Sequence, residues 1–477
     1  MRFFLLSLAC FSTAALAQEG PYLANGIKIG EVSPNSAIVW VRLTAAKERI
    51  AAPFGSSPPA QRVEDALIAR LPAALPGMPG DVSLDLSLRP DFSDSKQFET
   101  ARASQATDFT HQWRVGNLQP ATRYFVRVTA RGEGGKQTAQ VEASFTTAPP
   151  ETAWQDVKFA VMSCQSHKDR DDVSGFKIYP AMQKQGINFY VATGDNVYYD
   201  SDPPLATTVE MARFHWHRMY GLPWLVDFHR AIPGYWEKDD HDCYRNDGWP
   251  PQGKNADRSA ELTGELNFFK GLKIFREQVP MGEKTYRTFR WGKGLQIWLT
   301  EGRDFRSPNN MPDGPDKTIW GKEQMEWVKS SILASDAAFK VLISPTPIVG
   351  PDRGNKADNF SNKAFGHEGS AIRAWTKENK LTNLFTSCGD RHWQYHSVDP
   401  ATGLNEFSSG AASDVHAGGS PGLDAEYHKF HRVKGGFLTV TVARPDGQPT
   451  ITFRHHDVDG AVVYEKSFAA GQSPAIR

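Results

Sequence analysis

Side chains able to bind metal ions recur at four places between residues 164 and 392 of this 477-residue sequence. Carboxylate, amide oxygen, imidazole, thiolate and phenolate form a mixed donor set that no single metal would use alone. The set therefore predicts a cluster that contains a hard, redox-capable cation. The four places are Cys164; Asp195 with Tyr198; the run Asp239, Asp240, His241 and Asp242 with Asn246 and Asp247 behind it; and Asp390 with His392.

Each of these places follows or ends an apolar run that predicts a β-strand. The runs alternate with segments in which apolar residues recur at three- and four-residue spacing, which predicts helices. Strands alternating with helices indicate an α/β domain, whose site lies beyond the carboxyl ends of the strands. The predicted strands are 158–164, 188–195, 235–241, 295–303, 341–348 and 383–392, and the predicted helices are 173–184, 207–218, 260–276 and 322–333. A β pattern returns over 435–468 and should add strands to the sheet edge or to a second sheet.

Residues 20–150 alternate apolar and polar positions in short runs separated by Gly, Pro and Asn, which predicts an antiparallel β-sandwich. Strands are expected over 36–43, 112–115 and 123–130. Leu118, Pro120, Thr122 and Tyr124 resemble the L-x-P-x-T-x-Y corner of fibronectin type III domains. Residues 51–80 are rich in Pro, Ala and Gly and are expected to form a loop over this sandwich. We expect this domain to support or bind rather than to catalyse.

The chain begins with a pattern typical of a secretory signal peptide. Arg2 precedes an apolar core over 3–16, and small residues lead to Ala17. We therefore expect residues 1–17 to be removed and the protein to be periplasmic or secreted. A lipoprotein anchor through Cys10 is the alternative, although the residues before it fit poorly. No later stretch is apolar over 18 residues, so no transmembrane segment is expected.

The charge balance limits the classes of partner. Lys and Arg number 54 and Asp and Glu number 54, so no global field attracts nucleic acid or an anionic membrane. We expect a small-molecule partner, and the oligomeric state is left open.

The cysteine count is odd in the expected mature chain. Removal of Cys10 leaves Cys164, Cys243 and Cys388 in an oxidising compartment, so at least one thiol has no partner within the chain. Cys243 and Cys388 could form a disulfide, or both could be reduced and buried.

Taken in order, these motifs resemble those of the PhoD-type alkaline phosphatases, within the metallophosphoesterase superfamily. The resemblance covers residues 157–400, and the preceding β-sandwich resembles that family's N-terminal domain. It implies an all-β sandwich over residues 18–150, similar to fibronectin type III domains, followed by a metallophosphoesterase-like α/β/β/α sandwich over residues 151–477. The motifs are 163–164 (SC), 194–200 (GDNVYYD), 239–242 (DDHD) with 246–247 (ND), 303–306 (RDFR) and 389–392 (GDRH).

The resemblance implies an iron(III) ion held by thiolate and tyrosinate, with calcium beside it. The implied metal ligands are Cys164, Asp195, Tyr198, Asn246, Asp390 and His392, with Asp195 bridging two metals. The expected catalytic residues are Arg303, His241 and Asp240, and the expected substrate-binding residues are Arg303, Arg306 and Asn196. A guanidinium group suits a tetrahedral phosphate and its transition-state charge. Glu301 is unexpected here, because an additional carboxylate would repel a phosphate unless it binds metal or a substrate hydroxyl.

Several histidines could donate a proton to the leaving group. A structural role is the alternative for each of them, and His241 is the best candidate because it lies inside a metal motif. They are His167, His215, His217, His241, His396 and His416. The Gly- and Ser-rich segment 407–419 could close over the site or form a turn.

These observations predict an exported, metal-dependent phosphoric ester hydrolase, an alkaline phosphatase that acts on monoesters, diesters or both. A metal-bound hydroxide would attack phosphorus in line while calcium and Arg303 hold the oxyanion. One alternative is a phospholipase D-like phosphodiesterase for lipid head groups, which an exposed rim of Trp216, Trp224 and Trp249 would favour. Another is a non-catalytic cell-surface binding protein, against which the intact metal motifs argue.

Overall fold

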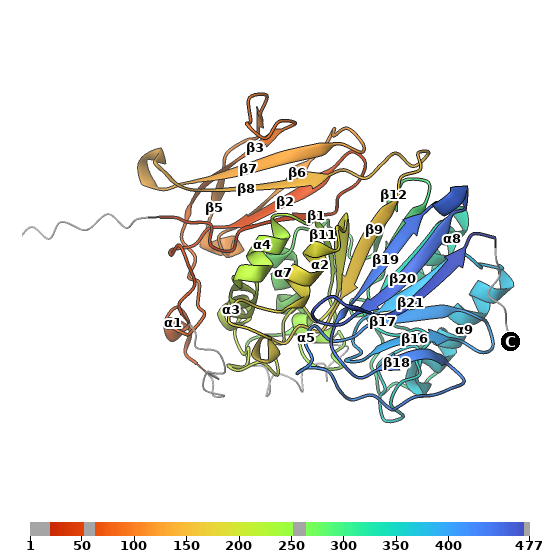
Figure 1. Ribbon diagram of the computed structural model, residues 1–477. Coiled ribbons are helices and arrows are strands. Elements are labelled where there is room, and N and C mark those ends of the chain that lie inside the picture. Colours follow the sequence, from red (N-terminus) through yellow and green to blue (C-terminus); the bar gives the residue numbers. More distant parts are fainter. Residues whose placement is uncertain (1–19, 52–62, 251–263, 472–477) are drawn as a thin grey trace, which may run out of the picture.

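The computed structural model describes residues 20–51, 63–250 and 264–471. The predicted signal peptide lies outside these ranges, as do parts of the predicted loop 51–80 and of the predicted helix 260–276. Two large sheets pack face to face, with helices on their outer faces. A smaller β-sandwich lies at the N-terminal end (Figure 1). Among the described residues, none of the helices combines the length and apolarity needed to cross a membrane.

The two central sheets contain nine and seven strands. Their orders are β21-β20-β19-β9-β10-β11-β1-β2-β6 and β12-β13-β14-β15-β17-β16-β18. The first contains β1 (Ile27–Gly30), β2 (Ala37–Arg42), β6 (Thr110–Val115), β9 (Val157–Met162), β10 (Phe189–Thr193), β11 (Gly234–Glu237), β19 (Phe437–Ala443), β20 (Thr450–His456) and β21 (Val462–Ala469). The second contains β12 (Arg287–Trp291), β13 (Leu295–Leu299), β14 (Phe339–Ser344), β15 (Leu384–Cys388), β16 (Gln394–Val398), β17 (Asn405–Ser409) and β18 (His428–Arg432).

Alternation along the buried strands places one core between the sheets and one under the helices on each side. In β10, Phe189 and Val191 join the core between the sheets, whereas Tyr190 and Ala192 pack with the helices. The first sheet is covered by α2 (Ile178–Lys184), α3 (Val209–Tyr220), α4 (Pro223–His229) and α7 (Phe268–Gln278), and the second by α8 (Gly321–Ala334) and α9 (Gly366–Glu378). This arrangement confirms the predicted α/β/β/α sandwich.

The N-terminal sandwich pairs part of the nine-stranded sheet with a smaller sheet. That smaller sheet contains β3 (Gly80–Ser87), β4 (Lys96–Gln97), β5 (Ala101–Ala103), β7 (Arg123–Arg131) and β8 (Gln137–Thr146). At the predicted corner, the buried Tyr124 accepts a hydrogen bond on Oη from the backbone N–H of Gln119 at 2.8 Å. The expected β-sandwich and its tyrosine corner are therefore present.

The sandwich and the larger domain share a sheet, which the sequence did not predict. β1 pairs in parallel with β11, with Gly30 opposite Gly234. Glycine is needed at Gly30, because a Cβ there would lie 2.2 Å from the carbonyl oxygen of Pro280. A single hydrophobic cluster includes Val126 of the sandwich and Val341 of the second large sheet. The boundary predicted near residue 150 therefore crosses a continuous core.

A buried ion-pair network also crosses this junction. Asp108 of the sandwich accepts hydrogen bonds from Arg42 Nε at 3.1 Å and from Gln278 Nε2 at 2.7 Å, and it contacts His217 on α3. Burial, and after it the Arg42 guanidinium, lower the pKa of His217 to about 4. The ring of His217 is therefore neutral beside the carboxylate at neutral pH.

Two local expectations are corrected. Residues 63–80 are not a plain loop over the sandwich: they contain the short helix α1 (Asp65–Ile68), and the buried Leu71 and Ala74 pack with residues of α3. The predicted strand 235–241 ends at Glu237, and the short helix α5 (Asp240–Cys243) begins soon after it. Asp239 is the N-cap of α5, and its backbone N–H donates to Asp242 Oδ1 at 2.7 Å.

Candidate metal centre

Four acidic or thiol side chains occupy equivalent positions at the carboxyl ends of strands. Cys164, Asp195, Asp239 and Asp390 each lie two residues beyond the last residue of β9, β10, β11 and β15, respectively. The ends of the two sheets meet closely, because a Cβ on Gly389 would lie 2.2 Å from the carbonyl oxygen of Thr193. The short Gly-Asp motif thus lets β15 approach β10, and the four side chains converge.

Three of these four residues have an unusual backbone conformation. The φ angles are 56° at Cys164, 55° at Asp195 and 58° at Asp390, all in the left-handed region. A side chain in this region costs on the order of 1–2 kcal/mol relative to glycine. Such strain concentrates at functional sites, where it directs a side chain toward a fixed point.

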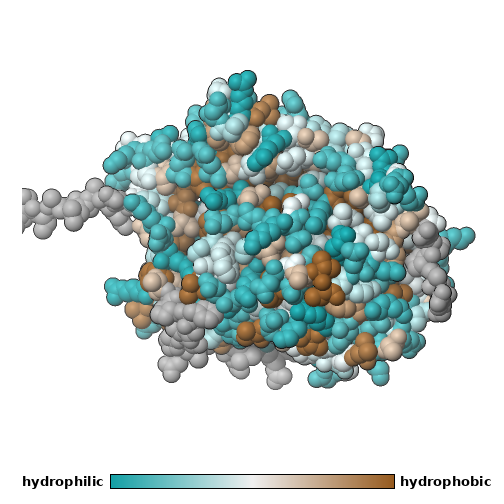
Figure 2. All heavy atoms as spheres, in the orientation of Figure 1, coloured by the Kyte–Doolittle hydropathy of each residue, from teal (hydrophilic) through white to brown (hydrophobic). Residues whose placement is uncertain are grey.

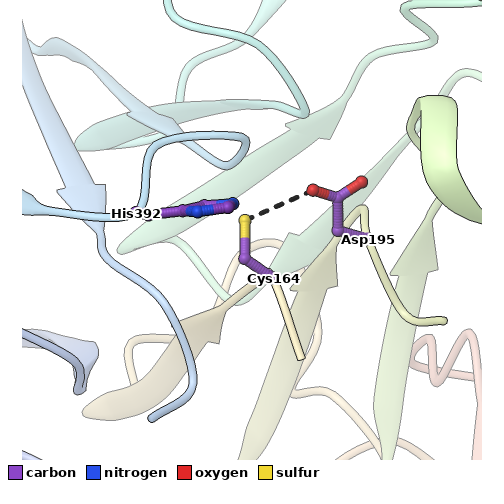
Figure 3. A group of neighbouring side chains, drawn as sticks. All are labelled: Cys164, Asp195 and His392. Carbon is purple, nitrogen blue, oxygen red and sulfur yellow. Dashed lines mark hydrogen bonds between the residues drawn. The ribbon is translucent and has the colours of Figure 1, made fainter. Parts of the chain in front are cut away.

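Cys164, Asp195 and His392 point toward one another from three different strand ends (Figure 3). Cys164 Sγ lies 3.4 Å from Asp195 Oδ2. Tyr198 Oη lies 3.1 Å from the same oxygen and 3.4 Å from His392 Nε2. One thiol, one carboxylate, one phenol and one imidazole therefore surround a common point.

Asp195 also belongs to two further groups of possible ligand atoms. It lies with Asp240 and His241 in one group and with Asp239 and Asp390 in the other, and the atoms within each group lie within 4.8 Å of one another. Asp195 is common to every group, and its expected role as a carboxylate shared between two metal ions stays a prediction.

Burial and mutual repulsion govern the electrostatics of the centre. Burial, together with repulsion from neighbouring carboxylates such as Asp240, raises the pKa of Asp195 well above its ordinary value. Burial and the adjacent Asp195 also raise the pKa values of the Cys164 thiol and the Tyr198 phenol. Burial lowers the pKa of His392, which keeps its ring neutral and able to bind a metal. A bound cation would displace the protons held by the acidic groups.

Arg303 holds two carboxylates of the centre. Its Nε donates to Asp239 Oδ1 at 2.5 Å, and its Nη2 lies 3.5 Å from Asp240 Oδ2. Burial would raise the pKa of Asp240, but Arg303 and then His241 bring it below its ordinary value. The guanidinium group is fully buried, so it fixes the direction of these carboxylates from within the protein.

Glu301, the unexpected carboxylate, is matched by a buried cation. Lys238 Nζ donates to Glu301 and lies 2.8 Å from Asp304 Oδ1. Glu301 also accepts the backbone N–H of Arg303 at 2.6 Å. Its role is therefore to hold the backbone that carries Arg303, and its negative charge is balanced locally.

The donor atoms fit a metal cluster. Within the part of the chain that the structure describes, the buried atoms Asp195 Oδ1 and Asp239 Oδ2 have no hydrogen-bond partner. Buried carboxylate oxygens without partners are costly unless they bind a cation. Thiolate, phenolate and imidazole beside several carboxylates form a mixed donor set that fits a cluster of metal ions.

Comparison with known families identifies the chain. Residues 159–434 match the PhoD-like phosphatase family, and residues 9–149 match the N-terminal domain of the same family. The first match spans more than half of the 477 residues. The chain belongs to the PhoD-like phosphatase family.

Individual relatives of this PhoD-like protein are distant in sequence. Alkaline phosphatase D of Bacillus subtilis (strain 168) is 20% identical over 317 residues, which cover 59% of this chain and 52% of the relative. The alignment thus spans about half of that relative's length. A solved structure of PhoD superposes with a TM-score of 0.71 at 17% identity, covering 94% of this chain and 90% of that chain. A purple acid phosphatase from yellow lupin (Lupinus luteus) seeds gives 0.60 at 10% identity, covering 93% and 74%. These structural likenesses establish the fold.

The structure brings together most of the ligands that the family motifs implied. Asn246 is the exception, because it is exposed and its backbone N–H donates to Asp200 Oδ2 at 2.7 Å. A ligand role for its side chain stays a prediction. The neighbouring residues are Cys164, Asp195, Tyr198, Asp390 and His392, and Asp239 and Asp240 lie with them although the resemblance did not imply them as ligands.

Two residues expected to contact substrate are buried and make hydrogen bonds within the protein. Asn196 is buried, and its amide donates to the Glu237 carbonyl oxygen at 2.9 Å and to Asp242 at 2.5 Å. Arg306 is buried as well, and it donates to Asn309 Oδ1 at 2.8 Å and to the Asp358 carbonyl oxygen. These hydrogen bonds hold both residues within the protein, as the bonds to Asp239 and to the Gly248 carbonyl oxygen hold Arg303. Substrate contacts by Asn196, Arg306 and Arg303 stay predictions.

The structure bears on the cysteine pairing and on the tryptophans of the expected rim. In the described part of the chain, Cys164, Cys243 and Cys388 are all free and buried, so the disulfide alternative is not realised. Trp216 is buried in the helical core and cannot belong to an exposed rim, whereas Trp224 and Trp249 are partly exposed. On the face shown in Figure 2, hydrophobic residues lie in small separate patches among hydrophilic ones.

The candidate histidines divide into two sets. His241 and His416 lie at the centre, where their rings are 4.3 Å and 5.1 Å from the ring of Tyr198. The others make structural contacts, for example His215 with the Pro204 carbonyl oxygen and His396 with Asn405. His416 reaches the centre from the loop that follows β17, so segment 407–419 contributes a side chain to the site.

Proposed function

We propose that this protein hydrolyses phosphoric esters at a metal cluster built on the carboxyl ends of β9, β10, β11 and β15. The observation that carries the proposal is the convergence of Cys164, Asp195 and His392, with buried carboxylate oxygens beside them that have no partner within the described residues. Iron(III) and calcium are the proposed ions, since thiolate and phenolate suit the first and carboxylates the second. When bound, such ions would activate water and neutralise charge on the phosphoryl group.

The chain would contribute positioned charges and a proton. Arg303 would keep Asp239 and Asp240 directed toward the metals. His241 donates through Nδ1 to Asp200 at 2.6 Å, because carboxylates accept hydrogen bonds. Burial alone would lower its pKa, but Asp240 and Asp200 raise the pKa of His241 well above its ordinary value. We propose that Nε2 of this ring supplies the proton that the leaving group needs.

Export is a second part of the proposal and rests on the N-terminal sequence. Arg2, the apolar core over 3–16 and the small residues near Ala17 form the pattern of a cleaved leader. Mass spectrometry of the protein recovered from periplasm and medium should find a chain that begins near Gln18. Recovery of the uncut chain in the cytoplasm would contradict export without affecting the proposed chemistry.

The decisive experiment measures metal content and hydrolysis on the same preparation, purified without a metal-affinity tag. We expect iron and calcium by elemental analysis, and hydrolysis of p-nitrophenyl phosphate or bis-p-nitrophenyl phosphate that stops after chelation and returns after reconstitution. Cys164→Ser and Asp195→Asn should lower both metal content and hydrolysis, the latter at least roughly a hundredfold. Cys243→Ala is the matched control, since Cys243 is also a free, buried thiol. Equal losses in Cys164→Ser and Cys243→Ala, or full activity after chelation, would contradict the proposal and favour a binding protein.

A further inference from the structure

A carboxylate and an imidazole that lie far apart in the chain form a pair at the edge of the centre. Asp169 Oδ2 lies 2.8 Å from His416 Nδ1, and these residues are 247 positions apart. Because the carboxylate accepts, Nδ1 carries the hydrogen of this bond. The opposite nitrogen, Nε2, lies 2.9 Å from Tyr198 Oη. The pair thus connects Asp169 to one of the proposed metal ligands.

The His416 ring also packs against a second proposed ligand. Its centroid is 4.2 Å from that of His392 and 5.1 Å from that of Tyr198, against which it lies edge-on. The side chain of His416 is 12% exposed and that of Asp169 is 18% exposed, so the pair lies between the buried centre and solvent. The ring therefore limits the positions that both Tyr198 and His392 can adopt.

The backbone that carries Asp169 is held on two sides. Asp202, in the loop after β10, accepts hydrogen bonds from Ser166 Oγ at 2.7 Å and from the backbone N–H of His167 at 2.6 Å. On the other side, the Asp169 carbonyl oxygen accepts a hydrogen bond from Ser413 Oγ at 2.6 Å. The loops that follow β9, β10 and β17 are thus tied together around this pair.

We propose that Asp169 and His416 are positioning residues, which hold the Tyr198 phenol oxygen where the metal centre requires it. This inference rests on the metal site in the proposed function. Asp169 fixes the orientation of the imidazole, and the imidazole fixes the phenol oxygen at a distance of one hydrogen bond. Residues that orient metal ligands in this way typically change metal affinity or activity by roughly ten- to a hundredfold when they are replaced.

The test uses the full-length protein and reads the centre by absorption spectroscopy and iron affinity. Tyr198→Phe should abolish the tyrosinate charge-transfer band. His416→Ala should shift that band and weaken iron binding by roughly ten- to a hundredfold. Asp169→Asn should shift the band in the same direction by a smaller amount. His416→Gln should restore part of the wild-type behaviour, because its amide can still form a hydrogen bond to Tyr198.

A control and a double variant separate positioning from loop damage. His431→Ala removes a 2.7 Å contact between His431 Nε2, on β18, and Ser420 Oγ, which lies in the same long loop as His416, and should leave the band unchanged. In the Tyr198→Phe background, His416→Ala should cause a smaller additional loss of iron than in the wild type, because only its contact with His392 is then left to lose. If His416→Ala fails to fold, His416→Gln and Asp169→Asn carry the test.

The outcomes distinguish this inference from the proposed function. An unchanged band and iron affinity in His416→Ala, beside a lost band in Tyr198→Phe, would overturn the positioning role and leave the metal site intact. An unchanged spectrum in Tyr198→Phe would overturn the ligand assignment itself. A shift of equal size in His431→Ala would show that only the loop matters, and would also overturn the inference.

Discussion

Cys164 and Asp195 occupy the same place on neighbouring parallel strands. Each lies two residues beyond its strand, their φ angles are 56° and 55°, and Cys164 Sγ lies 3.4 Å from Asp195 Oδ2. The sheet therefore sets the spacing of the two donors, and the left-handed turns direct both side chains to one point. The fold carries backbone strain at positions where it also requires a side chain.

The strain at Cys164 predicts an inverted order of stability for two substitutions that both remove the thiol. Cys164→Gly should be more stable than Cys164→Ala by about 1 kcal/mol, because glycine adopts a positive φ without the Cβ penalty. Urea unfolding of chelator-treated protein measures the difference. At Ser163, whose φ is not positive, the order should reverse, with alanine more stable than glycine. The same order at both positions would show that the turn at Cys164 is not strained.

Lys238 should be one of the most sensitive positions outside the metal centre. Lys238→Met leaves Glu301 and Asp304 without their buried cation and should lower the free energy of unfolding by roughly 3–5 kcal/mol. The double variant Lys238→Met with Glu301→Gln should recover part of that loss, because one uncompensated charge disappears. Thermal or urea unfolding provides the comparison. Additive losses in the double variant would show that the two side chains do not depend on each other.

Asp195→Asn should change how the metal-free protein responds to pH. The folded-state pKa of Asp195 lies above its unfolded value, so its stabilising contribution is present below about pH 4 and is lost as pH rises. In chelator, the wild type should therefore lose stability with rising pH more steeply than Asp195→Asn. With free metal at about a hundred times its dissociation constant, the wild type should gain about 2.7 kcal/mol and the variant little. Parallel pH profiles in chelator would contradict the raised pKa.

His217, at the junction between the sandwich and the larger domain, should make the protein lose stability as pH falls, which is the opposite of the effect expected for Asp195. Its folded-state pKa of about 4 lies below the ordinary value of 6.5, so its contribution is present above pH 6.5 and is lost as pH falls toward 4. Relative to His217→Gln, the wild type should lose about 2–3 kcal/mol over that interval. Urea titrations at pH 7.5, 5.5 and 4.5 measure the difference. A constant difference between the two proteins would indicate that His217 does not titrate in this range.

The metal centre was largely predictable because its donors follow strands. Cys164, Asp195 and Asp390 could be grouped from the apolar runs before them, since carboxyl ends of parallel strands meet. The pairing of Asp169 with His416 could not be predicted, because both residues lie in irregular loops whose contact depends on the whole fold. The surroundings of Asn196 could not be predicted for a related reason: a motif shows which residue follows a strand, but not whether its side chain faces the cavity or the core.

The layers of the fold were predictable, but the connection between the domains was not. The alternation of strands and helices indicated the α/β/β/α sandwich, and the segment around Tyr124 indicated the first domain. β1 is a strand of four residues, and its pairing with β11 is a contact between segments some 200 residues apart. Nothing in so short an apolar run indicates which strand it will pair with.

The shared sheet makes the N-terminal domain part of the scaffold that positions Asp239. β1 lies against β11, and Asp239 follows β11 by two residues, so the sandwich fixes one side of the strand that presents this carboxylate. Expression of residues 151–477 alone would leave β11 as a bare edge strand, open to pairing with other chains. We therefore expect the two parts of this protein to fold as one unit, and they should be expressed and engineered together although a linker separates them in the sequence.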